Sequence, residues 1–203
     1  MIAVVDYGVG NLFSLMSALR FLDIECIVTN RKEDLVQAER LILPGVGAFG
    51  SASEKLKESG LFEFVKESAR KKPLLGICLG MQLLFDKGFE HGEYEGLGLI
   101  PGIVRPLSSD IRPSLKVPHM GWNRLEIVKE DPISKYVSIG RWVYYVHGYY
   151  AKTDADYILG ISEYDLFVPG LVRSSFGKIY GMQFHPEKSG KTGLHLLKAF
   201  SEI

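Results

Sequence analysis

The first half of the chain alternates between short apolar runs and segments in which apolar residues recur at helical spacing. The apolar runs are residues 2–6, 25–29, 40–43 and 73–77. The helical segments are residues 11–22, 79–85 and a stretch that opens with a Ser51-x-x-Glu54 capping box and runs, broken near Gly60, to Lys72. Such alternation places helices on both faces of a sheet. The sequence therefore predicts an α/β fold with a doubly wound, mostly parallel sheet.

The second half has a different pattern, made of short aromatic or β-branched runs separated by turn residues. These runs are residues 97–107, 125–128, 142–152, 157–164 and 171–184, and an amphipathic helix is expected at 192–203. They predict antiparallel additions to the sheet. We found no linker or repeat, so a single domain over residues 1–203 is expected.

The composition excludes several classes of protein. Twenty-four basic residues balance twenty-four acidic ones, which argues against a surface for nucleic acid or an anionic membrane. No apolar run approaches the roughly 18 residues that span a bilayer, and the N-terminus lacks the basic region of a signal peptide. Two cysteines make no disulfide framework. A cytoplasmic protein is expected.

Two glycine-rich stretches resemble nucleotide sites but lack necessary residues. Residues 45–50 match the G-x-G-x-x-G fingerprint, yet the next strand ends at a cysteine instead of the carboxylate that would hold a ribose. The stretch Gly190-Lys191-Thr192 ends like a phosphate loop, but His185 stands where that loop needs a glycine. Neither stretch is expected to bind a nucleotide, and no cofactor is expected.

Cys78 lies between an apolar strand and an apolar helix, with Gly76 and Gly80 two residues away on either side. This is the pattern of a nucleophile elbow, in which glycines relieve the crowding of a sharp strand-to-helix turn. A helix N-terminus also favours a thiolate. The alternative is an inert buried cysteine. The flanking glycines favour the elbow.

A catalytic cysteine needs a base, and His185 is the best placed of the five histidines. It ends an apolar strand, and Pro186 favours an extended backbone there, so that Glu187 points to the same side. Glu187 could then orient the imidazole toward a thiol, as in a Cys–His–acid triad. His195 is expected on the apolar face of the last helix, and no histidine pair has convincing metal-ligand spacing, so no metal is expected.

Together, GICLGMQLLF (76–85) and GMQFHPEKS (181–189) resemble the class I, or triad, glutamine amidotransferases. The resemblance covers the whole chain and implies a flavodoxin-like sheet. Within the family, DYGVGNLFSL, LPGVGAFG and PHMGWN (118–123) are most similar to the glutaminase subunits of imidazole glycerol phosphate synthases. The resemblance to the class I family implies that Cys78, His185 and Glu187 release ammonia from L-glutamine.

The resemblance also implies roles for other residues. Backbone N–H groups of Leu79 and of the loop Gly45-Val46-Gly47 would hold the oxyanion. Because glycines flank Val46 on both sides, we expect this loop to be a switch that stays idle until a partner and its ligand turn an N–H inward. Substrate would be bound by Gln82, Glu90, Gly148 and Tyr149.

The partner implied is a (β/α)8-barrel cyclase that uses the ammonia to make imidazole glycerol phosphate and aminoimidazole carboxamide ribotide in histidine biosynthesis. For Trp122 and Tyr144, core packing is an equally good interpretation. The positions that match the family's interface are Asn11, Ser14, His119, Met120, Trp122, Tyr144 and Lys188.

Two other functions stay open from the sequence. The chain could serve a different synthase, such as one for anthranilate or guanylate, although PHMGWN and the absence of a second domain argue against this. It could also be a non-catalytic α/β binding module with a degenerate triad, although the intact Cys78, His185 and Glu187 argue against that.

Overall fold

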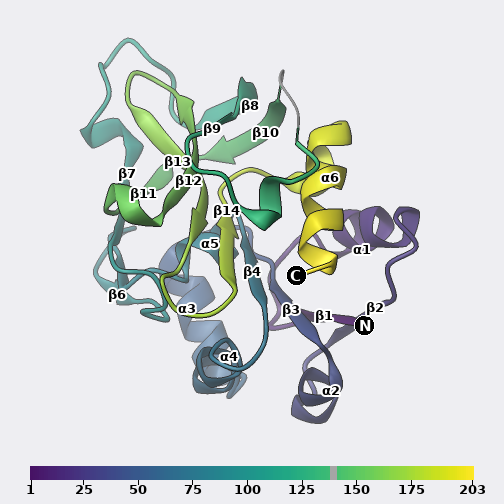
Figure 1. The fold of residues 1–203 in the computed structure, drawn as a ribbon. Helices are drawn as coiled ribbons and strands as arrows, with labels where there is room; N and C mark the ends of the chain where they lie inside the picture. The colour runs from purple at the N-terminus through teal and green to yellow at the C-terminus, as the bar shows by residue number, and fades with distance from the viewer. Residues whose placement is uncertain (138–140) are drawn as a thin grey trace.

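The computed structural model describes residues 1–137 and 141–203, and its centre is an eight-stranded sheet with the strand order β2-β1-β3-β4-β14-β13-β12-β9 within those residues (Figure 1). The first five strands of that order are parallel, and the others join antiparallel. The parallel strands are β1 (Ile2–Val5), β2 (Cys26–Thr29), β3 (Arg40–Leu43), β4 (Leu74–Ile77) and β14 (Ile179–Met182). The antiparallel strands are β9 (Glu126–Ile127), β12 (Ile158–Glu163) and β13 (Phe167–Arg173). The flavodoxin-like sheet with antiparallel additions is confirmed.

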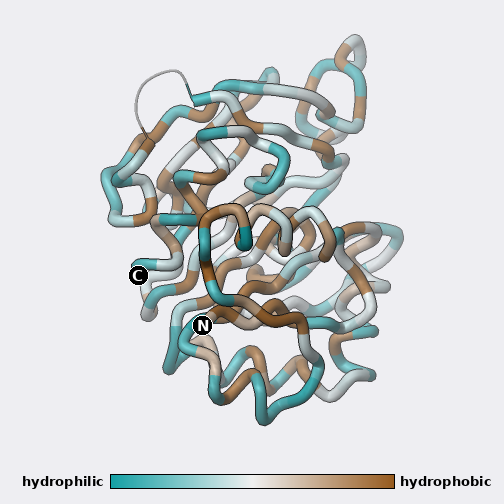
Figure 2. Tube along the Cα trace, turned by 90° about the vertical axis from the view of Figure 1, so that its right-hand side faces the viewer, coloured by the Kyte–Doolittle hydropathy of each residue, from teal (hydrophilic) through white to brown (hydrophobic). Residues whose placement is uncertain are grey.

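Helices cover both faces of the sheet, because successive side chains of each strand point to opposite sides. In β1, Ala3 and Val5 pack with α2, α3 and α4, whereas Ile2 and Val4 pack with α1 and α6. Figure 2 shows the hydrophobic stretches gathered along the inner strands. The helices are α1 (Leu12–Phe21), α2 (Lys32–Gln37), α3 (Phe49–Glu58), α4 (Phe62–Ser68), α5 (Leu79–Gln82) and α6 (Gly190–Ser201).

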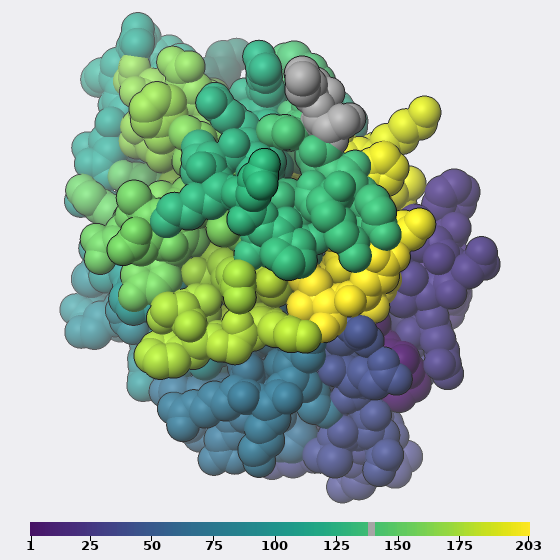
Figure 3. Space-filling model, viewed as in Figure 1, coloured from purple at the N-terminus to yellow at the C-terminus, as the bar shows by residue number. Residues whose placement is uncertain are grey.

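Two smaller sheets lie at the carboxyl end of the parallel strands (Figure 1). One is the antiparallel ribbon of β8 (His119–Arg124) and β10 (Trp142–His147). The other joins β5 (Lys87–Gly88), β6 (Tyr94–Glu95), β7 (Ile103–Pro106) and β11 (Tyr149–Lys152). Single 3₁₀ turns are η1 (Leu107–Ser109), η2 (Pro132–Ser134), η3 (Ala155–Tyr157) and η4 (Pro186–Lys188). In Figure 3, α6 is seen at the surface between the green segment that precedes β10 and the purple N-terminal region.

Two local predictions differ from the structure, and one helix was missed. The helix expected at 79–85 ends at Gln82, and α2 was not predicted because it is short and polar and buries only Leu35. His195 is exposed, not on the buried face of α6.

The start of α3 is also different. Its N-cap is Ala48, which has no side-chain cap, and the helix begins two residues before the Ser51 capping box. The backbone N–H of Phe49 instead donates to Glu90 Oε2 at 2.7 Å. A carboxylate from a distant loop therefore supplies the cap.

Within residues 1–137 and 141–203, no helix combines the length and the hydrophobicity that crossing a bilayer requires.

Candidate active site

Cys78 occupies a strained turn between β4 and α5. Its φ is +53°, in the region that non-glycine residues rarely adopt. A Cβ on Gly76 would lie 2.5 Å from the Gly80 carbonyl oxygen, and one on Gly80 would lie 1.8 Å from the Leu43 oxygen. The turn is therefore compatible only with glycine at both positions. The nucleophile elbow predicted from Gly76-x-Cys78-x-Gly80 is present in the structure.

The loop after β3 packs directly against this elbow. A Cβ on Gly45 would lie 2.8 Å from the Gly80 nitrogen, and the preceding Pro44 carbonyl accepts a hydrogen bond of 2.7 Å from the Tyr7 hydroxyl. Burial raises the pKa of Tyr7, which keeps that hydroxyl protonated as a donor. At the other end of the loop, Gly47 has φ of +100° and open space around its Cα. The loop is thus fixed at Pro44–Gly45 and unconstrained by packing at Gly47.

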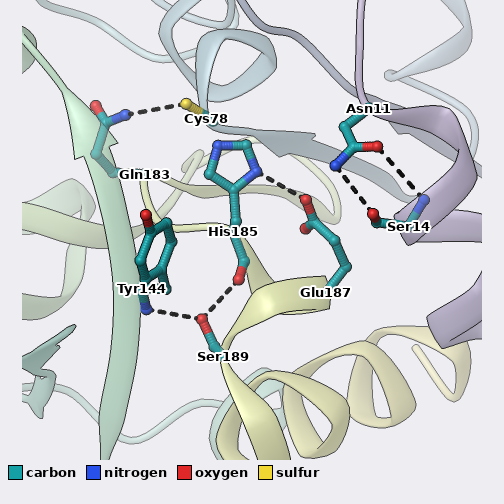
Figure 4. A network of polar contacts seen from close by, with 8 residues as sticks. All are labelled: Asn11, Ser14, Cys78, Tyr144, Gln183, His185, Glu187 and Ser189. Atoms are coloured by element: carbon teal, nitrogen blue, oxygen red, sulfur yellow. Dashed lines mark hydrogen bonds and ion pairs between the residues drawn. The ribbon is translucent and has the colours of Figure 1, made fainter. Parts of the chain in front are cut away.

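His185 and Glu187 face each other across one turn at the end of β14. His185 Nδ1 lies 2.8 Å from Glu187 Oε1, and both side chains are almost fully buried. The His185 backbone N–H donates to the Tyr144 carbonyl at 2.9 Å, which ties this turn to β10. In Figure 4, the ring nitrogen that Glu187 leaves free is turned toward Cys78. The extended His185 backbone that Pro186 favours is observed, with ψ of 100°.

The surroundings of His185 favour its charged form. Desolvation by burial lowers its pKa, but the interactions with Cys78 and Glu187 outweigh that effect and raise the pKa to about 10. An imidazolium between a carboxylate and a thiol is the arrangement in which Cys78 can be held as a thiolate.

One cavity of about 250 Å³ contains the reactive groups. Cys78 and His185 both line it, so a molecule bound there contacts the nucleophile and the base together. Gly45 lies behind the cavity wall, packed on the elbow. Of the residues predicted for the oxyanion and the substrate, the lining includes Val46, Gly47, Leu79, Gln82, Glu90, Gly148 and Tyr149.

The family model of class I glutamine amidotransferases matches residues 3–202. The chain belongs to this family. The prediction made from the cysteine and histidine motifs is confirmed at the level of the family.

Several relatives of this amidotransferase are similar along its whole length. Proteins named imidazole glycerol phosphate synthase subunit HisH from Bacillus cytotoxicus and Exiguobacterium sibiricum are each 50% identical, with 100% of this chain and 95% of the relative covered. The subunit of the same name from Listeria monocytogenes is 47% identical, with 100% and 96% covered.

Solved structures support the fold of the amidotransferase. A putative GMP synthase subunit from Thermoplasma acidophilum superposes with a TM-score of 0.72 at 20% identity, covering 99% of this chain and 92% of the other. The structure of PurLQS from Thermotoga maritima gives 0.73 at 22% identity, covering 99% and 97%. At this identity, the likeness is one of fold.

Gln82 is a buried residue of the amidotransferase rather than a solvent-facing one. Its Nε2 donates to the Tyr149 carbonyl at 3.0 Å and to Gln183 Oε1 at 3.1 Å. Both of its N–H groups are used within the protein, so only Oε1 is left for a ligand. Glu90 also lines the cavity, and its carboxylate accepts from the Phe49 N–H.

Most residues predicted for the interface of the amidotransferase do lie at the surface. Met120 is 61% exposed and Trp122 is 54% exposed. The Trp122 ring meets the Tyr144 ring edge-on at 6.1 Å, and Lys188 Nζ lies 5.9 Å from the Tyr144 ring. Trp122 is therefore not a core residue. Asn11 caps α1 and bonds to Ser14, beside Glu187 (Figure 4).

His119 differs from the other predicted interface residues, because its side chain is buried at 3% exposure. Its ring stacks between Tyr145 and Tyr164, and its Nδ1 lies 3.0 Å from His147 Nε2. A direct side-chain contact with a partner does not fit this position. The β8–β10 pairing, which the sequence pattern did not reveal, turns His119 inward.

Three further residues of the site were not predicted from the sequence. His147 lines the cavity, and Gln183 donates from Nε2 to the Cys78 sulphur at 3.9 Å. Ser189 accepts from the Tyr144 N–H at 2.9 Å and donates to the His185 carbonyl at 2.6 Å (Figure 4). Gln183 and Ser189 lie in the same nine-residue motif as His185, which was the available signal.

Among the described residues, no group of three or more histidine, cysteine, aspartate or glutamate side chains could hold a metal ion.

Proposed function

We propose that the protein is the glutaminase subunit of an imidazole glycerol phosphate synthase, a cytoplasmic enzyme of histidine biosynthesis, and that residues 1–203 form its single amidotransferase domain. The observation that carries the proposal is the 2.8 Å contact of His185 with Glu187 beside the strained Cys78, in one cavity. The full-length relatives at 47–50% identity, each named as a subunit of that synthase, support the choice of synthase.

The reaction begins with attack of the Cys78 thiolate on the side-chain carbonyl carbon of L-glutamine. The sulphur–carbon bond forms as the carbonyl electrons move to oxygen. When the oxyanion collapses, the carbon–nitrogen bond breaks, and protonated His185 gives its proton to the departing nitrogen. Ammonia leaves and a thioester remains. Neutral His185 then takes a proton from water, whose oxygen attacks the thioester and expels the Cys78 thiolate with glutamate as product. Glu187 orients the imidazole in both halves.

The oxyanion is held by the Leu79 N–H and by an N–H of the loop Gly45-Val46-Gly47. Removing one such donor costs about 3 kcal/mol of transition-state stabilisation. The open space around Gly47 lets a peptide of this loop rotate, whereas Gly45 is fixed against the elbow. The loop thereby serves as a switch that a bound partner turns on.

The remaining cavity residues bind the substrate's polar groups. Gln82 Oε1 accepts a hydrogen bond, Glu90 pairs with the ammonium group, and the backbone at Gly148 and Tyr149 completes the site. The ammonia passes to a (β/α)8-barrel cyclase, because protonation in bulk water would remove its nucleophilicity. The face that binds this cyclase includes Met120, Trp122, Tyr144 and Lys188, together with Asn11 and Ser14 at its edge.

Covalent labelling separates a catalyst from a binding module. A glutamine-analogue electrophile is expected to label the wild type at Cys78. Cys78→Ala should lose the label, whereas Cys26→Ala should keep it, because Cys26 lies on β2 and is not among the residues that line the cavity. Equal labelling of both cysteines would exclude the assignment of the nucleophile.

Turnover identifies the synthase. Glutamate release from L-glutamine is measured for the protein alone, with the barrel cyclase, and with the cyclase and its nucleotide ligand together. Low basal turnover that rises sharply only in the last case supports the proposal. Turnover that does not change when this partner is added would agree with the catalytic triad but would indicate a different synthase.

A further inference from the structure

The side chain of Gln183 is fully buried next to the nucleophile. It follows β14 directly, and its backbone N–H is already used by the Gly170 carbonyl at 3.0 Å. The side chain is therefore not needed for the strand pairing. Its Oε1 instead accepts from Gln82 Nε2 at 3.1 Å, and its Nε2 lies 3.9 Å from the Cys78 sulphur. Figure 4 shows the contact with Cys78.

The orientation of both amide groups follows from their partners. The Tyr149 carbonyl can only accept, so the atom of Gln82 that lies 3.0 Å from it is the nitrogen. That nitrogen has its second N–H directed at Gln183, which must therefore present its oxygen to Gln82. A reversed Gln183 amide would place two NH₂ groups against each other. The nitrogen of Gln183 consequently faces the sulphur.

We propose that Gln183 is a further catalytic residue, whose amide N–H donates a hydrogen bond to the Cys78 sulphur and stabilises the thiolate. Gln82 is the positioning residue that holds this donor in place. The inference rests on the proposed function, because it concerns the same nucleophile. It adds a neutral donor to the charged one, since His185 faces the sulphur from another side (Figure 4).

A neutral donor suits the chemistry of this site. The thiolate forms before attack on glutamine and again when the thioester is hydrolysed, and between these events His185 gives its proton to the departing nitrogen and regains one from water. Gln183 keeps its N–H throughout, so the sulphur has a donor that does not depend on the protonation state of His185. Hydrogen bonds to charged groups are stronger than neutral ones, and Cys78 is only 7% exposed.

The test is the pH dependence of Cys78 alkylation by iodoacetamide in the full-length protein, with Cys26→Ala as background. Gln183→Met keeps the length of the side chain and removes the N–H. We expect the midpoint of labelling to move to higher pH by about one unit, which is a roughly tenfold loss of thiolate below the midpoint. Gln37→Met, on the exposed end of α2, is the matched control and should leave the midpoint unchanged.

A second variant covers the case in which Gln183→Met does not fold. Gln82→Met leaves the Gln183 amide in place but removes the donor that orients it, so a smaller shift in the same direction is expected. Unchanged midpoints in the folded variants would overturn the inference while leaving the triad intact. If the wild type showed no preferential labelling of Cys78 over Cys26, the proposed function itself would be wrong.

Discussion

The imidazole rings of His119 and His147 are joined by a hydrogen bond of 3.0 Å between Nδ1 of the first and Nε2 of the second. His147 Nδ1 lies 2.9 Å from the Tyr149 carbonyl, which only accepts, so Nδ1 of His147 carries the proton. His119 Nδ1 must then donate to His147, while Asn123 Nδ2 donates to His119 Nε2 at 3.2 Å. This chain of donors ends on the carbonyl that also accepts from Gln82.

Both histidines of this pair are neutral in the folded protein, which predicts a loss of stability in mild acid. Burial lowers the pKa of His119 to about 4 and the pKa of His147 to about 3. Unfolded histidines bind a proton with a pKa of about 6.5. Below that pH the unfolded state binds more protons, so the free energy of unfolding should fall as the pH is lowered from about 6.5 toward 4.

Urea denaturation at several pH values between about 7.5 and 5 measures this slope. His119→Asn retains a donor near Nδ1 and removes one of the two titrating groups, so its slope should be shallower. The raised pKa of His185 affects both proteins alike, and its contribution is lost only as the pH rises from about 6.5 toward 10, so the two slopes are compared below about pH 6.5. Equal slopes in the wild type and His119→Asn would contradict the assignment.

Glu187→Gln should change the pH profile of the glutaminase as well as its rate. The variant keeps the shape and an acceptor for His185 Nδ1, but it loses the charge that helps to raise the pKa of His185 to about 10. The alkaline limb of kcat/KM should therefore move to lower pH, and kcat/KM should fall by about 100-fold or more. Assays with the partner between about pH 6 and 10 measure both effects. Glu58→Gln, at the exposed end of α3, is the control, and a Glu187→Gln profile that matches it would refute the role.

Gly80→Ala is expected to prevent formation of the elbow. The added Cβ would lie 1.8 Å from the Leu43 carbonyl oxygen, which is backbone within the sheet and cannot move aside. We expect a loss of about 3 kcal/mol or more in the free energy of unfolding, or no folded protein. Gly148→Ala is the control for stability, because its Cβ would meet only Val117 at 3.6 Å. Thermal unfolding compares the two, and equal stability would contradict this view of the elbow.

The parts of the fold that were predicted from the sequence depend on local patterns. Strands β1, β3 and β4 are short, largely apolar runs, and the elbow follows from three residues, Gly76, Cys78 and Gly80, in one turn. Likewise, His185 and Glu187 are two residues apart, so the extended backbone alone brings them together.

The parts that were missed depend on pairings between distant segments. Gln183 is oriented by Gln82, which lies 101 residues earlier in the chain, so no local pattern gives the direction of its amide. The burial of His119 follows from the register of β8 on β10, where it pairs with His147. A run such as HMGWNR contains too few β-branched or apolar residues to indicate a strand by itself.

Trp122→Ala should weaken binding of the cyclase subunit. The Trp122 indole is 54% exposed and lies edge-on to the Tyr144 ring. Tyr144 is on β10, and its carbonyl accepts a hydrogen bond from the His185 N–H. Lys188 Nζ lies 5.9 Å from the Tyr144 ring, and tryptophan and tyrosine are enriched among the residues that dominate binding energy. We expect a loss of about 2 kcal/mol, or roughly 30-fold in Kd, measured by titration calorimetry with the purified cyclase.

The matched control for this prediction is Phe176→Ala. Phe176 is 71% exposed, but it lies in the turn between β13 and β14, near α4 rather than near the β8–β10 ribbon. If the loss in Trp122→Ala came only from removing apolar surface, both variants would bind equally weakly. Because the Trp122 ring contacts Tyr144, and Tyr144 is tied through Ser189 to His185, only the Trp122 variant should also reduce the activation of glutamine hydrolysis by the cyclase. Wild-type affinity in Trp122→Ala would place the interface on another face.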